Sequence, residues 1–258
     1  AIADAVKENG ADVGLGFDGD GDRCGVVDNT GEEIFADKVG VMLARDISAL
    51  HRDAKFVVDV KSTGLFTTDP VLIENGASTT YWKTGHSYIK RFSHETGALV
   101  GFEKSGHFFF NPPLGRGYDD GLVAALAICD MLDRNPKKSM ADLKDALPKT
   151  WQSPTMSPKC ADEVKYGVVD RIIEDYKRRT GDGERIAGQA VRELITVNGI
   201  RVVLEDGTWG LVRASSNKPE LVIVVESPTS EENMRAIFAD IDHLLSQQPE
   251  VGAFNQKI

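Results

Sequence analysis

Short apolar runs alternate with stretches of helical periodicity along the first 147 residues. The runs are four or five residues long, the usual length of a buried strand, and lie at residues 13–17, 24–27, 56–60, 79–82 and 98–101. The helical stretches have apolar positions three or four apart or start and stop signals, and lie at residues 36–50, 70–74, 87–95 and 120–132. This alternation predicts a layered α/β domain. Residues 1–8 have the pattern of an amphipathic helix, so we expect the chain to begin inside a fold.

The pattern changes after residues 147–158, a segment that contains three prolines and that we interpret as a domain boundary. Residues 163–179 have helical periodicity, and apolar positions of a last helix recur over residues 234–244. Between them, residues 190–204 and 209–226 have the composition of strands, with turn signals at 198–199 and 206–207. Helices on either side of an antiparallel meander predict a smaller α+β domain.

The composition of the chain argues against several classes of binding partner. The chain of 258 residues has a formal net charge of −10 and a pI near 5.0, which argues against general affinity for nucleic acid or anionic membranes. An anionic substrate would therefore need a local basic patch. Three cysteines without a C-x-x-C pair argue against a disulfide framework or structural zinc, and favour a reducing, cytoplasmic location. We expect no membrane span, because no apolar run is long enough, and no signal peptide.

The most specific motif is the loop Asp18-Gly19-Asp20-Gly21-Asp22-Arg23 between two apolar strands. Carboxylate oxygens suit Mg²⁺, and the glycines allow a tight turn on which three carboxylates can converge. Without a cation these carboxylates would repel one another. Three negative charges, one Mg²⁺ and Arg23 sum to zero. The loop therefore predicts a magnesium site formed by Asp18, Asp20 and Asp22.

Two other interpretations of this segment fail on spacing. An EF-hand that began at Asp18 would need glycine at its sixth position and an acidic residue at its twelfth, but Arg23 and Asn29 stand there. Residues 14–19 match a G-x-G-x-x-G dinucleotide fingerprint. Acidic residues and a strand follow it in place of a helix, and those acids would repel a pyrophosphate.

Two further polar loops follow predicted strands. Glu103-Lys104-Ser105-Gly106-His107 combines an acceptor, a hydroxyl and an imidazole that together can hold sugar hydroxyls. Residues 83–87 place His86 and Ser87 between a strand and a helix. Taken alone, either segment is better explained as an ordinary polar loop.

A fourth polar loop, residues 213–219, lies between two predicted strands of the second domain. Arg213 offers a planar fork for phosphate, and the side chains that follow it add donors. The same segment is also compatible with a plain hairpin turn.

Together, and in this order, the four motifs resemble the α-D-phosphohexomutase superfamily, especially its bacterial phosphomannomutase/phosphoglucomutase branch. The resemblance extends over nearly the whole chain. It implies a metal loop at Asp18, Asp20 and Asp22. It also implies substrate contacts in a sugar loop and a phosphate loop, at Glu103, Ser105, His107, Arg213, Ser215, Ser216 and Asn217. Arg23, Lys61 and His86 match further residues of the active-site cleft, which would assist catalysis.

The resemblance also implies a domain organisation. Residues 1–32 would be the end of a second α/β domain, residues 33–150 the third domain, and residues 151–258 the α+β fourth domain. The catalytic Ser-His-Asn-Pro motif of the family's first domain does not occur in this sequence. The nearest string, Ser93-His94-Glu95-Thr96, lies in a predicted helix, and we interpret it as surface.

The sequence departs from the family pattern at two loops. Phe102 precedes Glu103 where the family has glycine, and Ser216-Asn217 replaces Asn-Thr. The second departure keeps hydrogen-bond donors in the phosphate loop but changes which side chains supply them.

The function implied is interconversion of hexose 1-phosphate and hexose 6-phosphate, of glucose, mannose or both. The family uses Mg²⁺, a phosphoserine and a hexose 1,6-bisphosphate intermediate, and we expect this chain alone to be inactive. One alternative is a phosphosugar-binding fragment without catalysis. Another is a metal-dependent sugar phosphatase that uses the aspartates. A phosphoglucosamine mutase fits the sugar and phosphate loops less well.

Overall fold

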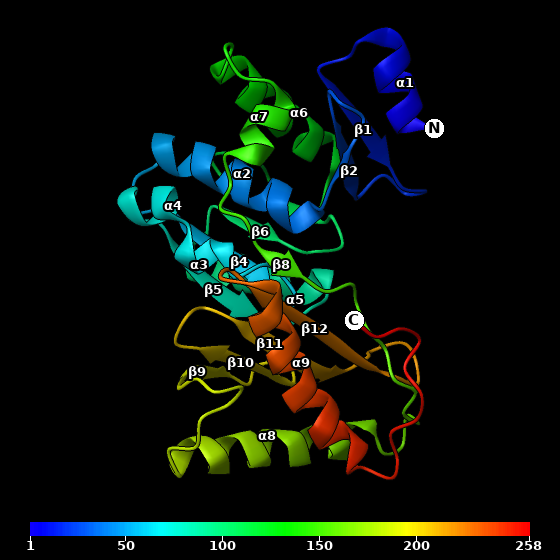
Figure 1. Ribbon diagram of the computed structural model, residues 1–258. Helices are drawn as coiled ribbons and strands as arrows, with labels where there is room; N and C mark the ends of the chain where they lie inside the picture. Colours follow the sequence, from blue (N-terminus) through cyan, green and yellow to red (C-terminus); the bar gives the residue numbers. More distant parts are fainter. The chain divides into compact units, whose positions relative to one another are not determined.

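The computed structural model describes residues 1–258, which fold into two compact units, Ala1–Pro148 and Lys149–Ile258. In the first unit, helix α1 (Ile2–Asn9) packs against an antiparallel sheet of β1 (Val13–Phe17), β2 (Cys24–Asp28) and β3 (Glu33–Ile34) (Figure 1). The polar loop at residues 18–23 is the turn between β1 and β2, as the sequence predicts.

The rest of the first unit is built around a second sheet. Its strand order is β5 (Ser78–Trp82), β4 (Lys55–Asp59), β6 (Val100–Phe102) and β7 (Phe108–Phe110). The pairs of β4 with β5 and with β6 are parallel, whereas β7 runs antiparallel to β6. Strand β4 is buried from its second residue onward, which explains its nearly uninterrupted apolar sequence.

Helices cover both faces of this sheet. On one face, α5 (His86–Thr96) places Ile89 in a cluster with Val57 and Phe109. On the other face, α2 (Ala36–Leu50) brings Gly40 so close to the ring of Phe102 that a Cβ at Gly40 would lie 3.2 Å from it. The short helices α3 (Leu65–Thr68) and α4 (Pro70–Glu74) follow β4. Helix α6 (Gly121–Arg134) contacts α2 and β7. The predicted α/β layering is therefore confirmed.

Helix α7 (Met140–Asp145) is joined to the N-terminal sheet by a buried ion pair. The ammonium of Lys144 donates to Asp28 Oδ2 at 2.6 Å, while Asp28 Oδ1 accepts from the backbone and hydroxyl of Thr30. Burial raises the pKa of Asp28, but the hydrogen bonds from Lys144 and Thr30 outweigh it and lower the pKa to about 2. A charged link thus holds residues 116 positions apart.

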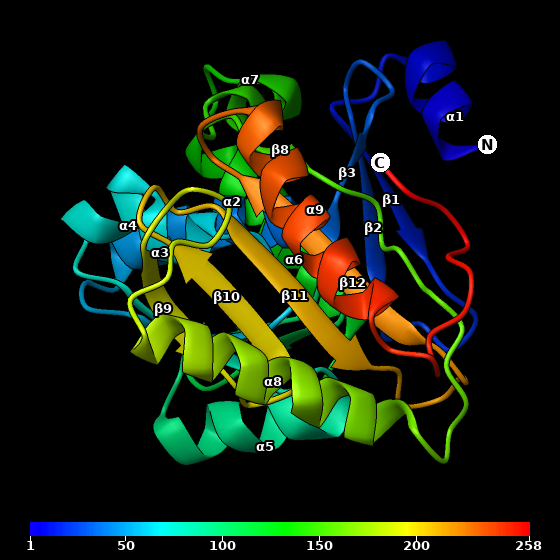
Figure 2. The ribbon, with the colours of Figure 1, turned by 60° about the horizontal axis from the view of Figure 1, so that its bottom comes forward.

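The second unit contains a five-stranded antiparallel sheet. Its order is β8 (Trp151–Gln152), β12 (Leu221–Ser227), β11 (Trp209–Ala214), β10 (Ile200–Leu204) and β9 (Val191–Ile195). Helices α8 (Lys165–Gly181) and α9 (Glu231–Ser246) lie across one face of this sheet (Figure 2). Their apolar sides form one core with alternate residues of the strands, among them Ile200, Val212 and Ile223. This is the α+β arrangement that the sequence predicts.

Two details differ from the sequence interpretation. Ser93 is not a surface residue: it is fully buried on the side of α5 that faces the sheet, and its hydroxyl donates to the carbonyl of Ile89 at 2.7 Å. Its neighbour His94 is exposed. Strands of two or three residues, such as β3 and β7, are too short to give a sequence pattern of their own.

No helix of the structure has the length and apolar character needed to cross a membrane.

Candidate functional site

The loop between β1 and β2 holds its three aspartates close together. One side-chain oxygen from each of Asp18, Asp20 and Asp22 lies within 4.8 Å of the others. Arg23 hydrogen-bonds to Asp18 through both its side chain and its backbone N–H. Burial raises the pKa of Asp18, but these bonds outweigh it and the pKa lies below its usual value. Asp18 is thus held as the anion, the form that can ligate a cation.

These residues fit the Mg²⁺ that the sequence predicts. Asp22 Oδ1 is buried and accepts no hydrogen bond, and Arg23 Nε, 3.8 Å away, is too distant to donate one, so a directly bound cation would satisfy this oxygen. All three donors are hard oxygens, the ligand type that Mg²⁺ prefers.

The metal loop lies directly on the first turn of α6. The backbone N–H of Gly121 donates to the carbonyl of Gly21 at 3.0 Å. A Cβ at Gly121 would come within 2.7 Å of that carbonyl oxygen and within 2.8 Å of the carbonyl oxygen of Arg23. Only glycine permits this close approach, so α6 helps to set the shape of the loop.

The other polar loops of the first unit follow the carboxyl ends of the parallel strands β4, β5 and β6. These ends meet at one edge of the sheet, where open α/β sheets commonly bind their ligands. Lys61 follows β4, His86 begins α5 just after β5, and residues 103–107 follow β6. The sequence placed each of these side chains at a strand-to-loop junction, and the structure brings them to one edge.

Glu103 connects two of these loops. It is buried, and it accepts from the backbone N–H of Gly85 at 2.8 Å and from the Ser105 hydroxyl at 2.9 Å. Burial, and then the negative charge of Asp59, raise the pKa of Glu103 above its usual value. Each carboxylate oxygen retains a further lone pair for a sugar hydroxyl.

Asp59, the last residue of β4, holds all three loops together. It is fully buried and accepts from the Ser62 hydroxyl at 2.6 Å, the Thr84 hydroxyl at 3.1 Å and the backbone N–H of Lys104 at 3.2 Å. The ammonium of Lys61 lies 3.6 Å from the same carboxylate. One buried anion therefore sets the relative positions of the residues predicted to contact a sugar.

The metal loop and the sugar loop are neighbours. Arg23 and His107 form an isolated antiparallel bridge between β2 and the segment that leads into β7. His107 Nδ1 lies 3.6 Å from Asp22 Oδ2 and 3.5 Å from Asp119 Oδ2, and His86 Nδ1 lies 3.4 Å from the same oxygen of Asp119. The structure thus brings Arg23, His86 and His107 together with Asp22.

The predicted phosphate loop joins β11 to β12 in the second unit. Arg213 donates to Asn198 Oδ1 and to the carbonyl of Ala214, each at 3.2 Å, and the Ser215 hydroxyl donates to Asn217 Oδ1 at 3.2 Å. A Cβ at Gly199 would lie 2.6 Å from the Cβ of Arg213, and Gly199 has a positive φ of 77°. The Asn198-Gly199 turn therefore packs directly on Arg213, while Ser216 is exposed.

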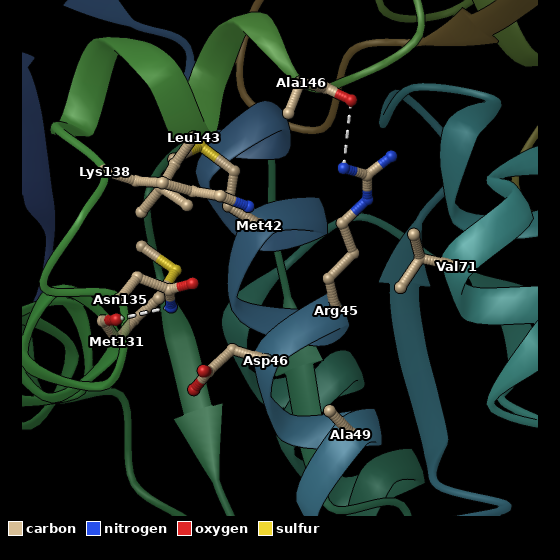
Figure 3. A pocket seen from close by; sticks show the side chains of 10 residues that line it. All are labelled: Met42, Arg45, Asp46, Ala49, Val71, Met131, Asn135, Lys138, Leu143 and Ala146. Carbon is tan, nitrogen blue, oxygen red and sulfur yellow. Dashed lines mark hydrogen bonds between the residues drawn. The ribbon is translucent and has the colours of Figure 1, made fainter.

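A separate cavity of about 240 Å³ lies between α2, α4 and the α6–α7 segment (Figure 3). Met42, Met131 and Leu143 give it an apolar wall, and Arg45 at its rim donates to the carbonyl of Ala146. None of the predicted site residues lines it.

Sequence reasoning missed three residues of the site: Asp59, Asp119 and Gly121. The string Asp119-Asp120-Gly121 could have pointed to two of them. Acidic residues at the start of a predicted helix are, however, also typical of an ordinary helix N-terminus. Only Asp120 has that role, since its side chain accepts from the N–H groups of the first helical turn. Asp119 instead faces the two histidines.

The two units, with polar loops at the carboxyl edge of an α/β sheet and a cationic loop in an α+β unit, define an α/β protein of the phosphohexomutase class. The family model for the α/β/α domain III of phosphoglucomutase/phosphomannomutase matches residues 35–151. The model for the C-terminal domain of the same family matches residues 159–244. The chain belongs to the phosphoglucomutase/phosphomannomutase family.

Individual relatives support the same family assignment. A phosphomannomutase/phosphoglucomutase from Pseudomonas putida is 36% identical over 246 residues, which are 95% of this chain and 50% of that protein. A phosphoglucomutase from Neisseria gonorrhoeae is 34% identical over 247 residues, 93% of this chain and 50% of that protein. A crystal structure of a family protein from Burkholderia thailandensis superposes with a TM-score of 0.79 at 29% identity, over 97% of this chain and 50% of that one. The chain spans about half the length of the curated relatives it matches.

Proposed function

We propose that this chain is the part of a phosphohexomutase that binds Mg²⁺, the sugar hydroxyls and the non-reacting phosphate of a hexose phosphate. The whole protein would interconvert hexose 1-phosphate and hexose 6-phosphate of glucose, mannose or both, through a phosphoserine and a hexose 1,6-bisphosphate. The observation that carries the proposal is the proximity of the metal loop and the sugar loop at the Arg23–His107 bridge.

Each loop has a distinct role in this proposal. Asp18, Asp20 and Asp22 would hold Mg²⁺, which neutralises negative charge on the phosphoryl group in transfer. Glu103, Ser105 and His107 would orient the sugar through its hydroxyls. Arg213, Ser215, Ser216 and Asn217 would bind the phosphate that is not in transfer.

Three further side chains would act near the reacting oxygens. Arg23 supplies a positive charge beside the metal loop, and Lys61 lies at the sugar edge of the sheet. His86 lies at the amino end of α5 and would help to move a proton between the sugar oxygen and solvent. The domain boundaries at residues 1–32, 33–150 and 151–258 belong to the same proposal.

Calorimetric titration with Mg²⁺ tests the metal assignment. We expect wild-type protein to bind one Mg²⁺ and Asp20→Ala to lose most of that affinity, because Asp20 is one of three ligands. Asp20 is exposed, so its loss should not disturb the fold. Asp12→Ala, an exposed aspartate outside the loop, is the matched control and should bind as wild type does. Equal binding by the wild type and Asp20→Ala would refute the assignment.

A coupled assay separates mutase from phosphatase. The chain contains no Ser-His-Asn-Pro donor, so residues 1–258 with glucose 1-phosphate, Mg²⁺ and trace glucose 1,6-bisphosphate should yield no glucose 6-phosphate. Formation of glucose 6-phosphate that disappears in Asp20→Ala would contradict the mechanism. Release of inorganic phosphate with the same dependence would favour the phosphatase.

A further inference from the structure

We propose a second cation site, formed by His86, His107, Asp119 and Asp22, that takes a borderline transition metal such as Zn²⁺ or Co²⁺. The site shares Asp22 with the predicted magnesium site but differs from it in having two imidazole ligands. It does not depend on the proposed mutase activity.

The distances among the donor atoms carry the proposal. One ligand atom from each of Asp22, His107 and Asp119 lies within 4.8 Å of the others, and His86 adjoins this group through Asp119. His86 Nδ1 and His107 Nδ1 lie 3.4 and 3.5 Å from Asp119 Oδ2, and His107 Nδ1 lies 3.6 Å from Asp22 Oδ2. Ligands bound at about 2.0–2.1 Å around a tetrahedral metal are separated by roughly 3.3–3.4 Å. Direct hydrogen bonds between an imidazolium and a carboxylate would instead be about 2.7–2.9 Å long. The spacing therefore matches the edges of a coordination polyhedron better than a set of hydrogen bonds.

A second observation concerns His107. Its Nδ1 atom is buried and has no hydrogen-bond partner, although two carboxylates face it. Neutral imidazole nitrogen is a preferred ligand of Zn²⁺ and Co²⁺. His107, Asp119 and Asp22 form a group of three donors, and the exposed His86, 3.4 Å from Asp119 Oδ2, would turn in to complete a set of four. Magnesium is a hard cation that prefers oxygen, so it would not compete well for the histidines.

Asp22 connects the two cation sites. Its Oδ2 faces His107, while its Oδ1 is the buried, unpartnered oxygen next to Arg23 of the metal loop. A carboxylate can bridge two cations through its two oxygens. Occupation of the second site would engage the imidazoles of both His86 and His107.

Cobalt spectroscopy on residues 1–258, with Mg²⁺ in large excess, tests the site. Four-coordinate Co²⁺ absorbs visible light far more strongly than the six-coordinate ion bound to oxygen ligands. We expect one equivalent of Co²⁺ to give the strong bands, and one equivalent of Zn²⁺ to abolish them. Absence of the strong bands in the wild type would overturn the proposal.

Substitutions of single side chains test which residues bind the Co²⁺. His107→Gln and Asp119→Asn should lose the bands, and His86→Gln should weaken Co²⁺ binding at least tenfold. The His86 side chain is 64% exposed, so this variant should fold even if the other two do not. The controls are His94→Gln, an exposed histidine on the same helix, and Asp20→Ala; both should keep the bands. Bands that survive in His86→Gln with unchanged affinity, or that disappear in Asp20→Ala, would contradict the assignment.

Discussion

Asp59 contacts three loops of the first unit at once, through Ser62, Thr84 and Lys104, yet it is buried too deeply to be a substrate ligand. We interpret it as a positioning residue. An asparagine has nearly the same shape but only one acceptor oxygen, so Asp59→Asn should leave at least one loop without its anchor.

Asp59→Asn should weaken the binding of glucose 1-phosphate by roughly tenfold, since a lost buried hydrogen bond costs about 1–3 kcal/mol. The Mg²⁺ affinity of the aspartate loop should stay unchanged, because Asp59 does not contact that loop. Calorimetry with both ligands measures the two effects separately. Asp130→Asn, an exposed aspartate of α6, is the control. Equal losses of both affinities in Asp59→Asn would indicate general destabilisation and contradict a positioning role.

At the level of single residues, the sequence predicted chemistry more reliably than geometry. Charge balance alone was enough to associate Arg23 with the aspartates, because opposite charges five residues apart in a tight loop meet locally. Asp59 and Asp119 were missed for a different reason. Asp59 appears as the end of an apolar run, and Asp119 acquires its partners only when β2, α5 and the segment before β7 come together. Such long-range contacts leave no local pattern.

Helix α6 and the metal loop are packed so closely that only glycine fits at their contact. In an ordinary helix, replacing glycine by alanine stabilises by up to about 1 kcal/mol. At Gly121 the sign should reverse, because the added Cβ would lie 2.7 Å from the carbonyl oxygen of Gly21.

We therefore expect Gly121→Ala to lower the affinity for Mg²⁺ severalfold and to lower the melting temperature. Calorimetry and thermal unfolding measure these two effects. Gly167→Ala is the matched control, since Gly167 lies in α8 and its added Cβ would meet only an arginine nitrogen at 3.9 Å. Unchanged Mg²⁺ affinity in Gly121→Ala would show that α6 does not shape the loop.

The link between α7 and the N-terminal sheet makes stability depend on pH. The pKa of Asp28 is about 2 in the folded protein and near 3.8 in the unfolded chain. Because the folded pKa is the lower one, the contribution is complete above pH 3.8 and is lost as the pH falls toward 2. The shift corresponds to about 2 kcal/mol.

Lys144→Met removes the cation of this link. Urea denaturation should show that the variant is less stable than wild type at neutral pH, by up to about 2 kcal/mol, because Lys144 supplies part of the Asp28 pKa shift and Thr30 and backbone N–H groups supply the rest. The difference should shrink as the pH falls below 3.8. Lys137→Met, an exposed lysine, should match wild type throughout. A stability difference that does not change with pH would exclude the Asp28–Lys144 pair as its source.

Helices and strands could be predicted from the sequence where the pattern of their own residues is enough to determine them. The long helices α2, α8 and α9 and the buried strand β4 follow from local periodicity, and so does the α/β to α+β order of the units. Short strands such as β3, β7 and β8 form only because a neighbouring strand offers hydrogen bonds. For the same reason the sequence could not show that the metal loop and the sugar loop meet at the Arg23–His107 bridge.

At the scale of the whole molecule, we propose that this chain binds a hexose phosphate and that Arg213 holds its phosphate. Arg213 lies in the second unit, whereas the metal and sugar loops lie in the first. Loss of a charge-assisted contact to phosphate costs about 1.5–3 kcal/mol, which is roughly a tenfold to hundredfold loss of affinity.

Calorimetric titration of glucose 1-phosphate and of mannose 1-phosphate into wild type and Arg213→Ala tests this claim most directly. Arg192→Ala, an exposed arginine of β9, is the control. We predict that wild type and Arg192→Ala bind equally well, and that Arg213→Ala binds both sugars at least tenfold more weakly. Equal affinity of wild type and Arg213→Ala for both phosphosugars would contradict the account.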